Sequence, residues 1–316
     1  MNQYSPIALV ILDGWGEWNI EKGNPIKKAK LPTIEELDKH YPKVLLQASG
    51  VAVGLPWGVM GNSEVGHQTI GSGQITFQHL PFITSSISDG TFFKNETLLG
   101  AIDWVKEKKS KLHLVGLVSD GEVHAHIDHL IALLALVKRQ ELDEVYVHAI
   151  TDGRDTHPKS AKKYLQTVMQ KIEEIGMGKI ATISGRYYTM DRNNNWDRIE
   201  KSFLALTEGK GIKEKDPFEA IDKQYDQDVF DEYLEPVVIT DEEGNPNGLI
   251  EDNDAIICFN FRKDRSRQIT KAFTVPDFQE FKEAKQPQNI KFVAFKEYEK
   301  GLPIEIAFHP PEITVR

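Results

Sequence analysis

Short segments rich in apolar residues alternate along the chain with longer segments in which apolar residues recur every three or four positions. Four runs have the length and the β-branched content of strands that are buried on both faces. These runs lie at 112–118, 145–150, 180–183 and 255–259. Residues 127–139 and 159–175 show helical spacing instead. The alternation predicts the α/β class, with a parallel sheet covered by helices on both faces.

An earlier apolar run, from Ile7 to Leu12, comes just before a region that is rich in glycine. The run ends at Asp13 and predicts a further buried strand. No basic residue precedes it, and it is shorter than the apolar core of roughly 7–15 residues that an export signal needs. Thr33 and Glu36 have the spacing of a capping box, which predicts a helix that begins at Thr33. Residues 216–247 are acidic and give no readable pattern.

Composition excludes several classes of protein. The 316 residues carry a formal net charge of −10, which argues against nucleic acid as the main partner because binding to phosphate backbones needs a basic face. No stretch approaches the ~20 apolar residues of a membrane span. Cys258 is the single cysteine, so an internal disulfide is excluded and a cytoplasmic location is expected. The length predicts two domains.

The arginines are concentrated where predicted strands end. Of the nine arginines, six are expected in loops directly after strands, namely Arg154, Arg186, Arg192, Arg262, Arg265 and Arg267. Ligands of open α/β sheets bind at the carboxyl ends of the strands, and guanidinium groups pair with phosphate and carboxylate through two parallel hydrogen bonds. One such arginine is more often a surface ion pair, but their convergence favours a site for a small, multiply anionic molecule.

Two other groups have both a functional and a structural interpretation. His126, Asp128 and His129 have ligand types suited to a zinc-like ion, but we favour their placement in the first turn of a helix, with only His124 facing a ligand. Ser63 comes at a turn that enters a helix, where free amides favour an alkoxide or a phosphate ester. The alternative for Ser63 is a simple N-cap, and the spacing alone does not decide between them.

Five segments together resemble cofactor-independent (2,3-bisphosphoglycerate-independent) phosphoglycerate mutase, a family of the alkaline-phosphatase superfamily. The resemblance extends over essentially the whole chain. The segments are 12–16 (LDGWG), 60–67 (MGNSEVGH), 151–156 (TDGRDT), 184–192 (SGRYYTMDR) and 260–265 (NFRKDR).

The resemblance implies two domains. Residues 1–76 would form the N-terminal part of a phosphatase-like domain with a parallel sheet, and residues 77–310 an inserted α/β domain that binds phosphoglycerate. Residues 311–316 would begin the return to the first domain. Family members are substantially longer, and the resemblance implies that a C-terminal segment bearing most of the metal ligands is absent from this chain.

The implied activity is the interconversion of 3-phosphoglycerate and 2-phosphoglycerate in glycolysis and gluconeogenesis, through a phosphoserine intermediate on a centre of two divalent ions, usually manganese. By position, Ser63 matches the nucleophile, and Asp13 with Ser63 matches ligands of one metal. Asp155 matches a proton shuttle. The residues that match the substrate-binding set are His124, Arg154, Asp155, Arg186, Arg192, Arg262 and Arg265.

Three hypotheses stay open. The first is a mutase in truncated form, the second is a non-catalytic fragment that keeps the anion pocket, and the third is a related phosphohydrolase. We expect a monomer whose partners are the two phosphoglycerates, with neither nucleic acid nor membrane. Because Asp13 and Ser63 are too few donors for two metal ions, we expect the chain alone to lack mutase activity.

Overall fold

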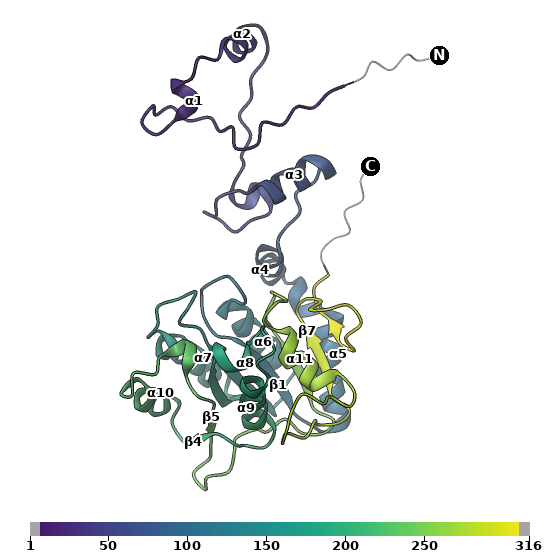
Figure 1. The fold of residues 1–316 in the computed structure, drawn as a ribbon. Helices are drawn as coiled ribbons and strands as arrows, with labels where there is room; N and C mark the ends of the chain where they lie inside the picture. The colour runs from purple at the N-terminus through teal and green to yellow at the C-terminus, as the bar shows by residue number, and fades with distance from the viewer. Residues whose placement is uncertain (1–6, 310–316) are drawn as a thin grey trace. The chain divides into compact units, whose positions relative to one another are not determined.

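The computed structural model describes residues 7–309, which form two compact units that divide after Pro81 (Figure 1). The first unit contains four short helices, and the second contains the sheet. Within the described residues, no helix has the length and apolar character that would let it cross a membrane.

The first unit has little secondary structure. Its helices are α1 (Pro25–Lys28), α2 (Pro32–His40), η1 (Gly50–Val53) and α3 (Ser63–Ser72). A small apolar core joins Val53, Leu55 and Val65. The strand predicted from Ile7 to Leu12 is wrong for this chain: the segment forms no strand, and Ile7 is 96% exposed. A strand of this kind needs neighbours on both sides, and the described residues of this unit provide none.

The helix predicted to begin at Thr33 begins one residue earlier, at Pro32. Leu31 occupies the N-cap position and makes no side-chain capping bond, so the expected capping box does not form. Proline suits the first helical position because its missing N–H would have no partner there and its φ angle is already helical. The proline therefore determines this boundary.

The second unit is built on an eight-stranded sheet with the order β4-β5-β3-β2-β1-β6-β7-β8. The strands are β1 (Leu112–Leu117), β2 (Val145–Thr151), β3 (Lys179–Gly185), β4 (Ile212–Glu214), β5 (Val237–Ile239), β6 (Ala255–Cys258), β7 (Lys291–Ala294) and β8 (Glu305–Ile306). All four strands predicted in this part of the sequence are present. Every residue of β1 and β2 is buried, as their mostly apolar sequences predict.

The sheet is parallel except at one edge. Strand β1 pairs in parallel with β2 and with β6, and the parallel pairings continue to β3 on one side and to β8 on the other. Strand β5 is antiparallel to β3, and β4 is parallel to β5. The strand order therefore reverses at β1, since the chain proceeds to β2 on one side and to β6 on the other. Such a switch point is where open α/β sheets bind ligands.

Helices cover the sheet in two groups. Helix α6 packs against α7, and α9 packs against α11. Crossovers on the two sides of β1 run in opposite directions, so their right-handed connections place α6–α7 and α11 on opposite faces. Helix α4 (His79–Asp89) spans the division between the units. The helices that follow it are η2 (Thr91–Lys94), α5 (Glu96–Lys108), α6 (Ile127–Arg139), α7 (Ala161–Ile175), α8 (Arg186–Thr189), α9 (Trp196–Thr207), α10 (Pro217–Tyr225), η3 (Asp231–Tyr233) and α11 (Arg267–Thr274).

Helix α7 begins at Ala161 rather than at the predicted Lys159. Its first amides are satisfied by a distant carboxylate: Asp231 Oδ2 accepts from the backbone N–H of Ser160 at 2.8 Å and of Ala161 at 2.9 Å. Asp231 lies in the acidic stretch whose sequence gives no readable pattern. A capping partner 70 residues away leaves no local sequence signal, which explains the error in the boundary.

A fully buried polar chain runs across the middle of the sheet. His113 Nε2 lies 3.0 Å from Asp254 Oδ2, His113 Nδ1 lies 2.9 Å from His148 Nε2, and His148 Nδ1 lies 2.9 Å from Thr182 Oγ1. Burial lowers the pKa of both imidazoles. Two neutral rings satisfy every bond if His113 donates its Nε2–H to Asp254, His148 donates its Nε2–H to His113 Nδ1, and the Thr182 hydroxyl donates to His148 Nδ1. This row of polar side chains links β1, β2, β3 and the residue just before β6.

Candidate anion-binding site and nucleophile

The residues expected to bind an anion gather at the carboxyl ends of β1, β2, β3 and β6. His124 follows β1, Asp155 follows β2, Arg186 follows β3 directly, and Arg262 follows β6. The backbone N–H of Phe261 donates to the carbonyl of His124 at 2.8 Å and so joins the loops after β1 and β6. These loops meet at the switch point of the strand order, as the sequence predicted for a parallel sheet.

Two glycines let the loops approach closely. A Cβ at Gly121 would lie 3.0 Å from the Cβ of Asp155 and 3.1 Å from Asp152 Oδ2. Gly153 has a φ of +66°, and a Cβ there would lie 2.7 Å from the Cβ of Asp231. A larger residue at either position would push the loop after β2 away from its neighbours.

Arg186 lies at the centre of the site, held by two carboxylates. Its Nη1 is 2.7 Å from Asp152 Oδ1 and 2.5 Å from Asp155 Oδ2, and the side chain is almost fully buried. Burial opposes the charge on Arg186, but the bonds to Asp155 and Asp152 outweigh it and raise its pKa. Its Nε is buried without a hydrogen-bond partner, which leaves one donor for a ligand.

Asp152 is the buried carboxylate that holds the guanidinium group of Arg186. Burial favours its neutral form, but the backbone N–H of Asp155, the Ser119 hydroxyl at 2.7 Å and Arg186 together lower its pKa. The carboxylate therefore stays charged and orients the guanidinium of Arg186 toward the loops. Asp155 differs because its side chain is 20% exposed, so it is accessible to a ligand.

A third carboxylate, Asp264, joins two more arginines. Its Oδ2 is 2.8 Å from Arg192 Nη1, and its Oδ1 is 3.0 Å from Arg262 Nε. Burial alone would raise the pKa of Asp264. The bond to Arg192 and the charge of Arg262 have a larger effect in the opposite direction, so the pKa is lowered. The side chains of Arg192 and Arg262 are 44% and 49% exposed, so both are available to a ligand.

The pKa of Arg265 shows how close the other arginines of the site lie to it. Its pKa is lowered, first by burial and then by the charges of Arg186, Arg192 and Arg154, against a smaller opposing effect of Asp264. Its Nη1 donates to the carbonyl of Met190 at 3.0 Å. Burial is the largest cause of this lowering, and the charges of the three neighbouring arginines add to it. Guanidinium groups gathered this closely suit the binding of an anion.

His124 lies between the two carboxylate groups. Its Nε2 is 4.0 Å from Asp155 Oδ2, and its Nδ1 is 3.8 Å from Asp264 Oδ1. Burial and the charge of Arg186 lower its pKa to about 4, so the ring is neutral at pH 7. Its Nδ1 is buried without a hydrogen-bond partner. A neutral ring offers a ligand one donor and one acceptor.

We expect His124 to make the second unit sensitive to acid. Its folded-state pKa of about 4 lies below its ordinary 6.5, so between these values the unfolded chain binds more protons. The contribution of His124 to the free energy of unfolding is fully present above pH 6.5. It is lost as the pH falls toward 4, and the loss amounts to up to about 3 kcal/mol. Denaturant titrations of wild type and His124→Gln at several pH values measure it. The dependence of stability on pH should be shallower in His124→Gln than in wild type, and an equal dependence in the two proteins would contradict this role of His124.

Ser63 and Asp13 lie together in the first unit. The Ser63 hydroxyl donates to Asp13 Oδ2 at 2.8 Å and lies 3.1 Å from His67 Nδ1. Asn62 is the N-cap of α3, and its side chain accepts from the backbone N–H of Val65. The alternative in which Ser63 only caps the helix is therefore wrong, because Asn62 does this and Ser63 is the first helical residue.

The metal donors in this unit are few. Asp13 and Ser63 provide two adjacent oxygens, the ligand type that manganese prefers. No group of three or more histidine, cysteine, aspartate or glutamate residues suited to a metal occurs within residues 7–309. Two donors fit one corner of a metal site but not a centre of two ions, which commonly takes about four to six ligands per ion.

The structure changes the interpretation of other predicted residues. Arg267 does not join the cluster: it begins α11, and its Nε lies 3.0 Å from Glu299 Oε2. The helical interpretation of His126, Asp128 and His129 is confirmed, since His126 is the N-cap of α6 and accepts from the backbone N–H of Asp128.

Sequence reasoning missed the carboxylates that organise the arginines. Asp152 and Asp264 stand within the two motif segments and had a usable signal, since each lies beside a predicted arginine. Glu232 had none, because it comes from the unassigned acidic stretch. Its Oε1 lies 3.2 Å from Arg154 Nη1.

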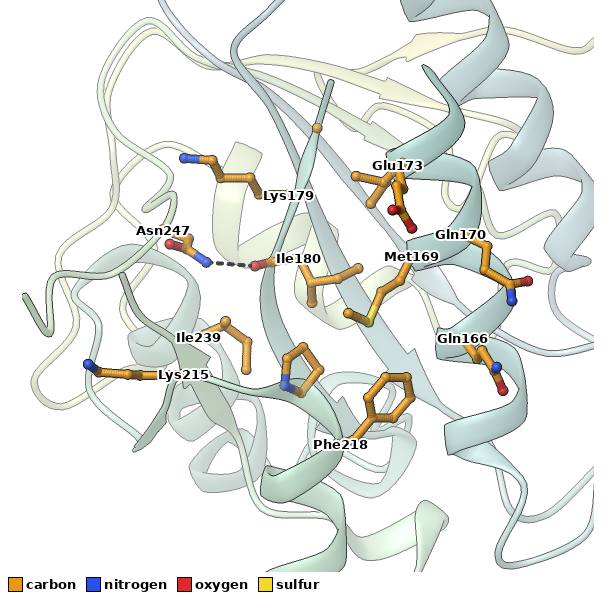
Figure 2. Close-up of a pocket in the computed structure, with 13 residues that line it drawn as sticks. Gln166, Met169, Gln170, Glu173, Lys179, Ile180, Lys215, Phe218, Ile239 and Asn247 are labelled. Carbon is orange, nitrogen blue, oxygen red and sulfur yellow. Dashed lines mark hydrogen bonds between the residues drawn. The ribbon is translucent and has the colours of Figure 1, made fainter. Parts of the chain in front are cut away.

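A separate hollow of about 490 Å³ lies at the opposite, amino edge of the sheet (Figure 2). Its walls include Ile180 at the start of β3, Ile239 at the end of the antiparallel β5, and Phe218. Lys215 on its rim already bonds Glu242 at 2.7 Å. None of the predicted site residues lines this hollow, so it is distinct from the arginine cluster.

Fold and site together define a doubly wound α/β domain in which arginines and carboxylates gather at the switch point of the strand order. The family model described as "BPG-independent PGAM N-terminus" matches residues 83–300. The chain belongs to this family of the N-terminal region of 2,3-bisphosphoglycerate-independent phosphoglycerate mutases.

Curated relatives agree. The chain is 47% identical over 308 residues to the 2,3-bisphosphoglycerate-independent phosphoglycerate mutase of Moorella thermoacetica, and 47% identical over 310 residues to that of Clostridium perfringens. Each match covers 98% of this chain and 60% of the relative, so the chain spans about three fifths of their length.

A solved structure is similar as well. It is a Leishmania mexicana phosphoglycerate mutase determined at low cobalt concentration, with a TM-score of 0.74 and 31% sequence identity. The match covers 90% of this chain and 54% of that one. The predicted α/β class is thereby confirmed, with the reversed strands β4 and β5 as the departure from a wholly parallel sheet.

Proposed function

We propose that this chain serves the interconversion of 3-phosphoglycerate and 2-phosphoglycerate, an isomerase reaction of glycolysis and gluconeogenesis. The single observation that carries the proposal is the gathering of exposed guanidinium groups at the carboxyl ends of the strands, namely those of Arg154, Arg192 and Arg262. Phosphoglycerate carries a phosphate and a carboxylate, and guanidinium groups pair with both. The names of the curated relatives support the same reaction.

The residues divide into anchors and ligand contacts. Arg154, Arg192 and Arg262 are half-exposed and would contact the anionic groups of the substrate. The Nε–H of Arg186, which has no partner within the described residues, would donate a hydrogen bond to the substrate. Asp155 is partly exposed beside Arg186 and is suited to take and return a hydroxyl proton of glycerate. His124, neutral at pH 7, would bond a hydroxyl group without adding charge.

Ser63 is the proposed nucleophile. It lies at the first position of α3, where free backbone amides and the helix dipole favour a phosphate ester. Asp13 accepts its proton in a hydrogen bond and holds the hydroxyl in one orientation. A phosphoserine formed here would return its phosphoryl group to the other hydroxyl of a glycerate that stays bound.

A divalent ion, manganese by our sequence-based expectation, would lower the pKa of the serine hydroxyl and neutralise phosphate charge. Asp13 and Ser63 are the residues that would hold it, together with donors beyond the described residues. The relative solved at low cobalt concentration supports a role for divalent ions.

A second candidate is a non-catalytic fragment that binds phosphoglycerate. The small number of metal donors within residues 7–309 favours it. A turnover assay of the purified chain with added manganese separates the candidates, since turnover supports the first and binding without turnover supports the second. The single, buried Cys258 fits a reducing cytoplasm, and a monomeric state remains our expectation.

Removal of one exposed arginine tests the anion site. We expect Arg262→Ala to weaken binding of 3-phosphoglycerate about tenfold, because a hydrogen bond to a charged group contributes about 1.5–3 kcal/mol. Arg139→Ala is the control, since Arg139 ends α6 and stacks on the ring of Phe93. Calorimetric titration measures both. Equal weakening by the two variants would show that the site is misplaced.

A further inference from the structure

The loop between β6 and α11, residues 259–266, carries three of the charged groups of the site, and a buried tyrosine supports it. Tyr298, on the connection after β7, is 1% exposed. Its hydroxyl donates to the carbonyl of Asn260 at 2.6 Å and lies 3.2 Å from Cys258 Sγ. The phenol thus fixes the backbone two residues before Arg262.

Asn260 continues the support toward the arginines. Its Oδ1 accepts from the backbone N–H of Leu117 at the end of β1 at 2.9 Å, and its Nδ2 donates to Ser266 Oγ at 3.2 Å. Ser266 Oγ donates in turn to the carbonyl of Arg262 at 3.3 Å. All three side chains of this network, Tyr298, Asn260 and Ser266, are buried.

The network also reaches the partner of Arg265. Asn260 Nδ2 lies 3.8 Å from Met190 Sδ, and the carbonyl of Met190 accepts from Arg265 Nη1 at 3.0 Å. The hydrogen bonds of the Tyr298 hydroxyl go to Cys258 and Asn260, and those of the Asn260 side chain go to Leu117, Met190 and Ser266. They determine where the backbone that carries Arg262 and Arg265 lies, because buried polar groups tolerate few alternative arrangements.

We propose that Tyr298, acting through Asn260, is a positioning residue that holds Arg262 and Arg265 in the geometry that binds phosphoglycerate. The proposal rests on the proposed function for its ligand, but the support of the loop is independent of it. Tyr298→Phe removes the hydroxyl and keeps the ring. Tyr146→Phe is a matched control, since its hydroxyl also donates at 2.6 Å, to Glu144, at the amino edge of β2.

Amide hydrogen exchange of the full chain without ligand tests the support. We expect amides of residues 260–266 to exchange faster in Tyr298→Phe than in wild type, and to be unchanged in Tyr146→Phe. Unchanged exchange of these amides in Tyr298→Phe would overturn the proposal, whatever the ligand of the site is.

Binding of 3-phosphoglycerate, followed by NMR titration of the full chain, tests the consequence. We expect Tyr298→Phe to weaken binding about fivefold, as the loss of one hydrogen bond allows, and Tyr146→Phe to leave it unchanged. In a background of Arg262→Ala and Arg265→Ala, Tyr298→Phe should weaken binding less than about twofold. A purely structural role would instead give the full loss, again about fivefold, in that background.

The outcomes separate the two proposals. A wild-type chain that fails to bind 3-phosphoglycerate contradicts the proposed function, while the exchange measurement still decides the role of Tyr298. If the wild-type chain binds 3-phosphoglycerate but Tyr298→Phe causes its full loss of affinity in the background of Arg262→Ala and Arg265→Ala, the positioning role is contradicted and the proposed function is not.

Discussion

A Ser63→Ala variant should lose mutase turnover by on the order of 10³-fold or more in any preparation that interconverts the phosphoglycerates. The alanine has no oxygen to accept the phosphoryl group, and Asp13 loses its 2.8 Å hydrogen-bond donor. Binding of 3-phosphoglycerate should persist, because the arginines that we assign to it lie in the second unit. Incubation with labelled substrate, followed by measurement of label on the protein, follows the phosphoenzyme directly.

Ser72→Ala is the matched control for this experiment. Ser72 ends the same helix, and its hydroxyl bonds the carbonyl of Gln68 at 2.7 Å. The control should keep both turnover and labelling. Label on the Ser63→Ala protein would place the nucleophile elsewhere and contradict the role of Ser63.

Removal of Arg186 should have the largest effect on stability. Arg186→Met should lower the free energy of unfolding by about 3–5 kcal/mol, since it leaves the buried carboxylate of Asp152 without its counter-charge. The same variant should abolish measurable binding of 3-phosphoglycerate, because Asp155 then repels the anion. Denaturant titration of the full chain, followed by far-UV circular dichroism, measures the first effect.

The double variant Arg186→Met with Asp152→Asn tests the cause. Neutralisation of the carboxylate should recover more than half of the lost stability but none of the binding. A double variant no more stable than Arg186→Met would mean that the loss comes from packing and not from the unpaired charge.

Much of the second unit follows from local sequence. Strands β1, β2, β3 and β6 are almost entirely buried, so their sequences are mostly apolar and identify them, although His113, His148 and Thr182 interrupt the first three. Because the carboxyl ends of parallel strands meet at one edge, the order of residues along the chain is enough to predict that His124, Asp155, Arg186 and Arg262 lie near one another.

The errors have a common physical origin in distant partners. Residues 7–12 have the composition of a strand, but a strand needs neighbours, and the described residues of the first unit offer none. The start of α7 depends on Asp231, 70 residues away. Strands β4 and β5 are three residues each, too short for a readable alternation.

The supporting residues of the site were hidden for the same reason. Tyr298 acts from the connection after β7 on a loop 38 residues earlier. Glu232 pairs with Arg154 across 78 residues. The sequence shows which arginines follow strands, whereas the carboxylates and hydroxyls that orient them come from segments with no motif of their own.

Calorimetric titration of the purified chain with 3-phosphoglycerate tests the central claim most directly, with the Arg262→Ala and Arg265→Ala double variant measured in parallel. We predict saturable binding of one molecule per chain that the double variant weakens at least about a hundredfold, the product of two losses of about tenfold each. Absence of binding to the wild-type chain at millimolar concentration, or equal binding by the double variant, would contradict the account.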